Sequence, residues 1–228
     1  PSKHYMVDLS ERVKEIKKLV DSGKYFTINR ARQYGKTTTL SSLKKVLNLE
    51  YIVLSLDFQS LDNDVFKDGA TFSQAMSRII IDAYEFENVP VPEDTISALE
   101  KLNSSDSQMI KMDNLFRILK RWIKKSDKPI VLMIDEVDSA TNNQVFLDFL
   151  AQLRDGYIRR DTNGTPAFQS VILAGVTDVK HLKSKIRSGD DMKENSPWNI
   201  AADFTVDMSL SEAGIKGMLD EYEEDHYT

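Results

Sequence analysis

The sequence predicts an α/β protein, a three-layer α/β/α sandwich around a mainly parallel sheet. Short apolar segments suited to strands alternate with longer segments whose apolar residues recur at helical spacing. Near the start, a helix at residues 36–47 separates strands at 24–29 and 51–58, and strands joined in this way run parallel. The continuous apolar run at 130–134 is typical of a strand at the centre of such a sheet. Ligands of these sheets bind at the carboxyl ends of the strands.

The other elements follow from apolar spacing and from turn residues. Residues 9–20 place apolar side chains on one helical face, with Ser10 available as the N-cap. Residues 88–108 contain two prolines, which indicates an insertion or loop with at most a short helix at 95–102. Residues 161–164 form a predicted turn. The predicted helices are 9–20, 36–47, 71–84, 110–124, 143–157 and 211–224, and the predicted strands are 24–29, 51–58, 128–135, 170–174 and 204–208.

Composition predicts one domain over residues 1–228, since 228 residues with 41% hydrophobic content can bury one substantial core. The net charge of −6 argues against a generally basic nucleic-acid-binding surface, and the basic side of helix 110–124 is more simply a solvated face. The absence of cysteine excludes disulfides and thiol catalysis and is typical of a reducing cytoplasm. No apolar run approaches the roughly 20 residues that span a bilayer, so we expect a cytoplasmic protein without a membrane partner. A start at Pro1 instead of methionine suggests a fragment of a longer protein.

A Gly-Lys-Thr sequence at a strand-to-helix turn predicts a phosphate-binding loop. Gly35 lets the backbone curl so that its N–H groups face a phosphate, and Lys36 reaches the β and γ phosphates. Thr37 offers its hydroxyl to Mg²⁺, and the helix that follows points its N-terminal dipole at the same anion. The residues expected to contact the nucleotide are Arg32, Gln33, Tyr34, Gly35, Lys36, Thr37 and Thr38.

Two carboxylates end the apolar strand about 100 residues further on. Asp135 is expected to hold Mg²⁺ opposite Thr37, and Glu136 to orient and deprotonate the attacking water. This Asp-Glu pair, with an extra strand between it and the loop, is typical of P-loop NTPases that carry a catalytic glutamate. Thr177 then follows the strand at 170–174, where such enzymes keep a polar γ-phosphate sensor, although it could equally cap a helix at 179–186.

The loop departs from the standard pattern Gly-x-x-x-x-Gly-Lys-Ser/Thr, because Arg30 stands in place of the first glycine. The leading hypothesis is an ATP-binding module that hydrolyses MgATP slowly and uses the cycle as a conformational switch. The alternative is a non-catalytic interaction module in which Arg30 blocks or replaces phosphate contacts. A kinase acting on a small molecule shares the loop, but it lacks an evident arginine-rich lid here, and the Asp-Glu pair favours water as the acceptor.

Four segments, 25–40, 134–138, 173–178 and 196–201, resemble the predicted bacterial AAA-ATPase-like family. The resemblance runs over nearly the whole chain, and the Arg-x-Arg-Gln-x-Gly-Lys-Thr-Thr form of the loop is its specific feature. It implies a bacterial protein with ATP and Mg²⁺ as cofactors, and an arginine at the first glycine position is usual in this family.

The resemblance also implies partners. The wider AAA class completes each site with an arginine from a neighbouring subunit, so a homo-oligomer is expected, with Arg187 as the best positional candidate for that catalytic role. From the architecture of this family, residues 4–8 are expected to contact adenine. Family members often continue into a C-terminal nuclease-like domain, which would connect a longer parent protein with nucleic acid.

Overall fold

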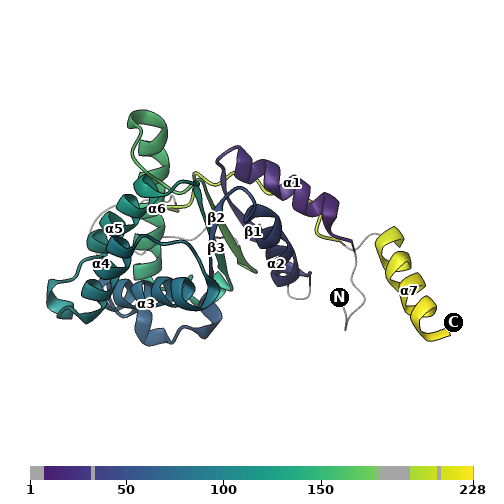
Figure 1. Ribbon diagram of the computed structural model, residues 1–228, viewed down its shortest axis with the longest axis horizontal. Coiled ribbons are helices and arrows are strands. Elements are labelled where there is room, and N and C mark those ends of the chain that lie inside the picture. Colours follow the sequence, from purple (N-terminus) through teal and green to yellow (C-terminus); the bar gives the residue numbers. More distant parts are fainter. Residues whose placement is uncertain (1–7, 32–33, 178, 180–195, 210–211, 228) are drawn as a thin grey trace.

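Four parallel strands form the sheet of this protein (Figure 1). The structure, a computed structural model, describes residues 8–31, 34–177, 179, 196–209 and 212–227. The strands lie in the order β1-β4-β3-β2, so β4 stands between the first strand and the third. Their bounds are β1 (Tyr25–Asn29), β2 (Ile52–Asp57), β3 (Ile130–Asp135) and β4 (Ser170–Gly175).

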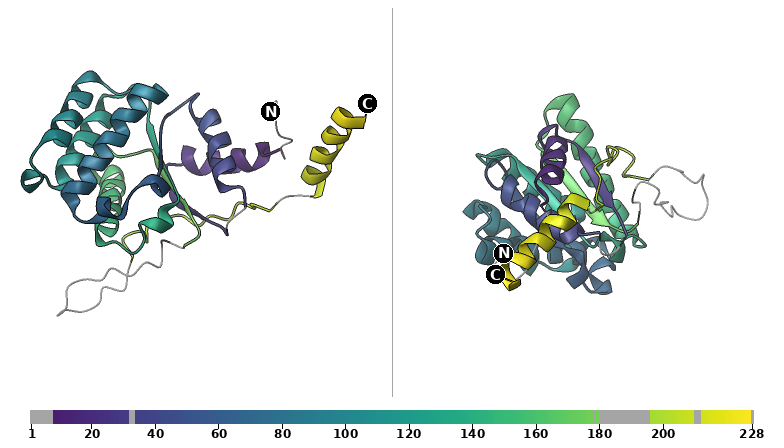
Figure 2. Two further views of the ribbon diagram at one scale, coloured as in Figure 1. Left: turned by 90° about the horizontal axis from the view of Figure 1, so that it is seen from below. Right: turned by 90° about the vertical axis from the view of Figure 1, so that its right-hand side faces the viewer.

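Helices cover both faces of the sheet, which confirms the predicted three-layer α/β/α sandwich (Figures 1 and 2). Alternate strand residues enter two separate cores, as the two-residue period of a strand requires. Val53 and Val131 pack with α1 and α2, whereas Leu54 and Leu132 pack with the helices of the other layer. The first layer contains α1 (Ser10–Asp21) and α2 (Lys36–Leu47), and the second contains α3 (Gly69–Glu87), α4 (Glu93–Ser104), α5 (Met112–Lys125) and α6 (Gln144–Asn163).

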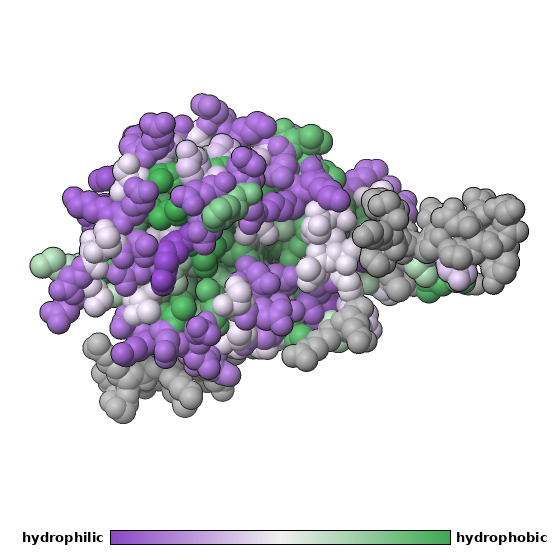
Figure 3. All heavy atoms as spheres, turned by 60° about the horizontal axis from the view of Figure 1, so that its bottom comes forward, coloured by the Kyte–Doolittle hydropathy of each residue, from purple (hydrophilic) through white to green (hydrophobic). Residues whose placement is uncertain are grey.

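The last helix, α7 (Glu212–Tyr227), stands apart from the sandwich in Figure 1 and in the left view of Figure 2, beyond the side that carries α1 and α2. The face of the molecule in Figure 3 is mainly hydrophilic, with apolar side chains in a hollow near its middle. No helix in the described ranges has the length and apolar character that crossing a membrane requires.

The range 88–108 was predicted to be an insertion or loop, and this prediction was wrong in part. It contains the 12-residue helix α4, whose Leu99 is fully buried in the larger core. The prolines do not interrupt this helix because Pro92 lies at its N-cap with φ −60° and ψ 142°. Val89 and Val91 alternate with the prolines and are buried, so the linker before α4 also belongs to the core.

Two smaller predictions also need correction. Residues 204–208 form no strand: one isolated parallel bridge to β1, between Phe26 and Ala202, precedes them, and the chain then continues through 203–208 without strand pairing. The predicted turn at 161–164 is instead the end of α6, which runs to Asn163 and is closed by Gly164 at φ 71°.

Candidate functional site

The loop between β1 and α2 gives the start of α2 the geometry of an anion site. Gly35 lies at the N-cap of α2 with φ 67° and ψ 28°, a left-handed conformation that favours glycine. Because Gly35 has no side chain to cap the helix, the first N–H groups of α2 are left to a ligand or to water. The loop is therefore shaped where the sequence predicts phosphate binding.

Lys36 braces this loop from inside. Its side chain is buried, and its Nζ donates hydrogen bonds to the backbone oxygens of Arg30 (2.9 Å) and Ala31 (3.2 Å). An ammonium group has three protons, so one remains for an anion held by the loop. The first position of the loop thus contributes its backbone carbonyl, a role that does not depend on its side chain.

The side chain of Arg30 is turned toward other parts of the chain. Its Nη1 donates to the backbone oxygen of Asn29 at 2.9 Å, and its Nη2 donates to that of Val206 at 3.4 Å. The guanidinium also lies 5.6 Å from the ring centroid of Phe204. Arginine in place of glycine is accommodated because its side chain binds the segment after residue 202.

Thr37 and Asp135 meet across the carboxyl edge of the sheet. The Thr37 hydroxyl donates to Oδ2 of Asp135 over 2.8 Å. Two neighbouring ligands of an octahedral Mg²⁺, each at about 2.1 Å, are about 3 Å apart, so this pair of oxygens fits such an ion. These two residues would hold Mg²⁺, which would supply positive charge beside a phosphate and leave its other positions to phosphate oxygens and water.

Glu136 lies directly after the strand in a strained conformation. Its φ of 53° and ψ of 42° place a non-glycine residue in the left-handed region, which is rare and concentrates at functional sites. The backbone N–H of Glu136 donates to Asp135 Oδ1 at 2.9 Å, and its carbonyl accepts from the Ser139 hydroxyl at 3.1 Å. These bonds hold the turn that presents the half-buried Glu136 side chain beside Asp135.

Asp138 ties this turn to the end of β4, a role that the sequence did not predict. Its carboxylate accepts from the backbone N–H groups of Val176 and Thr177, both at 2.7 Å. Partial burial raises the pKa of Asp138, but the bonds from Thr177 and Val176 and the charge of Lys36 lower it more, so the net pKa is below its usual value. The predicted sensor, Thr177, is thereby fixed to the turn that carries Glu136.

Gly175 makes this close approach possible. A Cβ atom at Gly175 would lie 2.8 Å from Asp138 Oδ2, a distance that real side chains essentially never show, and 3.0 Å from Cγ2 of Val137, which is tighter than most real contacts. A sequence signal for this contact existed in the glycine that precedes Val176 and Thr177, but its partner could not be read from the sequence.

The structure brings together four of the predicted site residues, Lys36, Thr37, Asp135 and Glu136, and places Thr177 next to them through Asp138. Tyr34 and Thr38 are exposed at the loop and the start of α2. Predictions for Arg32, Gln33, Arg187 and residues 4–7 fall outside the described residues, as does nearly all of the alternative helix at 179–186.

The Ser-Pro-Trp segment at 196–201 is structural. Trp198 is buried, its Nε1 donates to the hydroxyl of Thr27 in β1 at 2.9 Å, and its ring stacks on Tyr25. The Ser196 hydroxyl donates to the backbone oxygen of Val179. This segment fixes the chain after β4 to β1, the strand that leads into the phosphate-binding loop, and so it helps to hold that loop in place.

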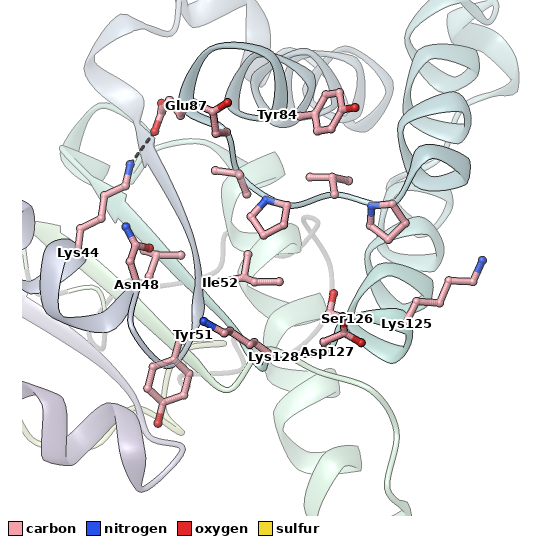
Figure 4. Close-up of a pocket in the computed structure, with 16 residues that line it drawn as sticks. Lys44, Asn48, Tyr51, Ile52, Tyr84, Glu87, Lys125, Ser126, Asp127 and Lys128 are labelled. Carbon is pink, nitrogen blue, oxygen red and sulfur yellow. Dashed lines mark hydrogen bonds and ion pairs between the residues drawn. The ribbon is translucent and has the colours of Figure 1, made fainter.

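A cavity of about 620 Å³ lies at the amino ends of β2 and β3, away from the phosphate-binding loop (Figure 4). Ile52 at the start of β2 and Lys128 just before β3 line it, and the ion pair between Lys44 and Glu87 lies at its edge. Since Lys36 and Asp135 are at the carboxyl ends of β1 and β3, this cavity is not part of the phosphate site.

Similar structures include those of Cdc6p and ORC proteins. They include Cdc6p from Pyrobaculum aerophilum (13% identity, TM-score 0.43, covering 73% of this chain and 38% of that chain). The Aeropyrum pernix ORC1 protein, solved in complex with DNA, has 8% identity and a TM-score of 0.49, covering 96% and 50%. Drosophila ORC bound to DNA has 12% identity and a TM-score of 0.39, covering 75% and 76%. The chain thus spans half or less of the length of the first two.

Sequence comparison identifies the family directly. No curated protein sequence matches the chain. The model of the AAA-like domain family, however, matches residues 2–203, which include the loop, the Asp-Glu pair and the Ser-Pro-Trp segment. With that match over most of its length and with a parallel sheet that carries a phosphate-binding loop, the chain belongs to the AAA-like domain family, a nucleotide-binding type of P-loop module.

Proposed function

We propose that this protein binds ATP with Mg²⁺ at the loop of residues 30–38, hydrolyses it slowly, and uses the cycle as a conformational switch. The observation that carries this proposal is the convergence of Lys36, Thr37, Asp135 and Glu136 at one edge of the sheet, with the 2.8 Å bond from Thr37 to Asp135. A cation donor, a metal-binding pair and a carboxylate base are the groups that phosphoryl transfer to water needs.

Each residue has a distinct part in the proposed reaction. The remaining N–H of Lys36 donates a hydrogen bond to the β and γ phosphates, and the first N–H groups of α2 bind the same oxygens. Glu136 accepts a proton from the attacking water, while Thr177 donates to the γ-phosphate. Thr37 and Asp135 hold Mg²⁺, which neutralises phosphate charge.

The competing proposal, a non-catalytic interaction module, required Arg30 to block or replace phosphate contacts. The guanidinium bonds to the backbone oxygens of Asn29 and Val206 argue against blockage. The partners implied by resemblance, namely a second copy that supplies Arg187 and nucleic acid reached through a nuclease-like domain, stay predictions.

Calorimetric titration with ATP in the presence of Mg²⁺ tests nucleotide binding. Lys36→Ala should weaken affinity by about 10- to 150-fold, since the lost charge-assisted bond to phosphate contributes about 1.5–3 kcal/mol. Lys45→Ala, an exposed lysine of the same helix, is the matched control and should bind as the wild type does. Equal affinity of wild type and Lys36→Ala would refute the site.

Turnover is tested separately by phosphate release. Glu136→Gln keeps the size of the side chain but removes the base, so it should retain ATP binding and lose most hydrolysis. Hydrolysis that continues undiminished in Glu136→Gln would exclude Glu136 as the base. Binding without any turnover in the wild type would favour the interaction module.

A further inference from the structure

Residues 202–209, which we call the strap, lead from the body of the protein to α7. The strap begins beside β1, where the Ala202 N–H donates to the backbone oxygen of Tyr25 at 2.8 Å. Val206 and Met208 are buried in the core formed with α1 and α2. The strap is therefore packed on the body, whereas α7 stands apart from it (Figures 1 and 2).

One arginine joins the strap directly to the phosphate loop. The backbone oxygen of Arg30 accepts from Lys36, and its side chain donates to Val206 of the strap. Its guanidinium lies over the ring of Phe204, which stacks on Phe26 of β1 with centroids 5.8 Å apart. Because the backbone of Arg30 contacts Lys36 and its side chain contacts the strap, a shift of the Arg30 backbone is transmitted directly to the strap.

A second arginine, Arg12 in α1, joins the strap to α2. Its Nη2 donates to the backbone oxygen of Ser209 at 2.8 Å, and its Nε donates to that of Asp207 at 3.3 Å. Its Nη1 donates to the hydroxyl of Thr39 at 3.3 Å, and Thr39 is a buried residue two positions after Thr37. The same guanidinium thus contacts the phosphate-binding helix and the end of the strap.

We propose that Arg12 and Arg30 couple phosphate binding at the loop to the position of the strap, an inference that rests on the proposed function. A phosphate bound by Lys36 and the first turn of α2 restrains the backbone of Arg30 and the position of Thr39. Both arginines are then held more firmly, and so is the strap. Because coupling between two sites is reciprocal, contacts of the strap raise nucleotide affinity by the same factor.

The bonds from the arginines to these partners differ in length. Those from Arg30 to Val206, from Arg12 to Asp207 and from Arg12 to Thr39 are 3.3–3.4 Å long, longer than the usual 2.9–3.0 Å, whereas the bond from Arg12 to Ser209 is 2.8 Å long. The match to the AAA-like domain ends at residue 203, so it does not include Val206, Asp207 and Ser209, the strap residues that the two arginines contact.

Hydrogen exchange measured by mass spectrometry on the full chain tests the coupling, with Mg²⁺ and a non-hydrolysable ATP analogue as the probe. In the wild type, amides of residues 202–209 should exchange about tenfold more slowly when the analogue is bound, within the 5- to 150-fold range of typical couplings. Arg30→Ala should remove most of this protection, since only the Arg12 contacts remain, and should weaken analogue binding by the factor by which the protection falls. A merely structural role would leave the response of 202–209 to the analogue intact.

Two further variants keep the test decisive. Phe204→Leu removes the ring under the Arg30 guanidinium without touching the loop, so it should weaken both protection and affinity even if Arg30→Ala does not fold. Arg121→Ala, an exposed arginine of α5, is the control and should respond as the wild type does. Calorimetry separates the failures: no binding of the analogue refutes the proposed function and the coupling together, whereas binding with unchanged exchange at 202–209 refutes the coupling alone.

Discussion

Replacing Gly175 with alanine should destabilise the protein, because no space exists for a Cβ atom at the end of β4. The new atom would lie 2.8 Å from Asp138 Oδ2 and 3.0 Å from Val137 Cγ2. Overpacking of this kind costs about 1–3 kcal/mol, and displacing the carboxylate weakens at least one hydrogen bond to a charged acceptor, which contributes about 1.5–3 kcal/mol. We expect Gly175→Ala to lower the free energy of unfolding by about 2–5 kcal/mol.

Urea unfolding followed by tryptophan fluorescence measures this change, since Trp122 and Trp198 are both buried. Gly156→Ala is the matched control. Gly156 lies inside α6, where alanine is the better helix former, and its new Cβ would meet Ala167 at an ordinary 3.5 Å, so the change should be neutral or stabilise the protein by up to about 1 kcal/mol. In an Asp138→Ala background, Gly175→Ala should cost less, because the atom it collides with is gone. A loss below about 0.5 kcal/mol in the wild-type background would refute the described packing.

Three other changes have defined outcomes. Glu136→Gly should raise the free energy of unfolding by about 1 kcal/mol by relieving the left-handed strain, while phosphate release is lost; thermal unfolding and the hydrolysis assay check the two effects, and a lower melting temperature would argue against strain. Asp138 has a lowered pKa in the folded state, so its contribution to stability is present above pH 3.8 and is lost as the pH falls below that value. The urea midpoint of Asp138→Asn should therefore vary less with acid pH than that of the wild type. Parallel pH profiles of the two midpoints would contradict this. Trp198→Phe removes the donor to the buried hydroxyl of Thr27 and should cost about 1–3 kcal/mol in urea unfolding, whereas an unchanged midpoint would mean that the bond contributes nothing.

The sequence predicted the parts of the site that depend on local order. The apolar strands 25–29 and 130–135, the glycine turn at Gly35 and the carboxylates at the end of β3 are recognisable within a few residues, because strand burial and helix starts have local signatures. The helix α4 was underestimated since two prolines usually indicate a loop, and only burial of the neighbouring valines reveals a packed linker.

The contacts that complete the site are not local, and for that reason they could not be predicted. Asp138 bonds to amides 38 and 39 positions away, and Arg30 donates to a carbonyl 176 positions away. The segment 204–208 has alternating apolar residues typical of a strand. Two of its backbone carbonyls, however, accept hydrogen bonds from arginine side chains and not from a neighbouring strand. Neither periodicity nor propensity contains information on such partners.

The position of β4 between β1 and β3 has a consequence for how the protein is made. Among the four described strands β1 pairs with β4 alone, beside its single bridge to Ala202, and the register joins Tyr25 to Val171. In contrast, β2 and β3 pair across a shorter separation, from Ile52 to Ile130. At about 5–20 residues per second, a ribosome completes the partner of β1 roughly 7–30 seconds after β1 itself. The strand that carries the phosphate loop therefore waits as an unpaired apolar segment while the rest of the sheet assembles. Nucleotide can stabilise only the stage at which β1 has joined the sheet, and until then this apolar strand is a segment of the nascent chain that is open to aggregation.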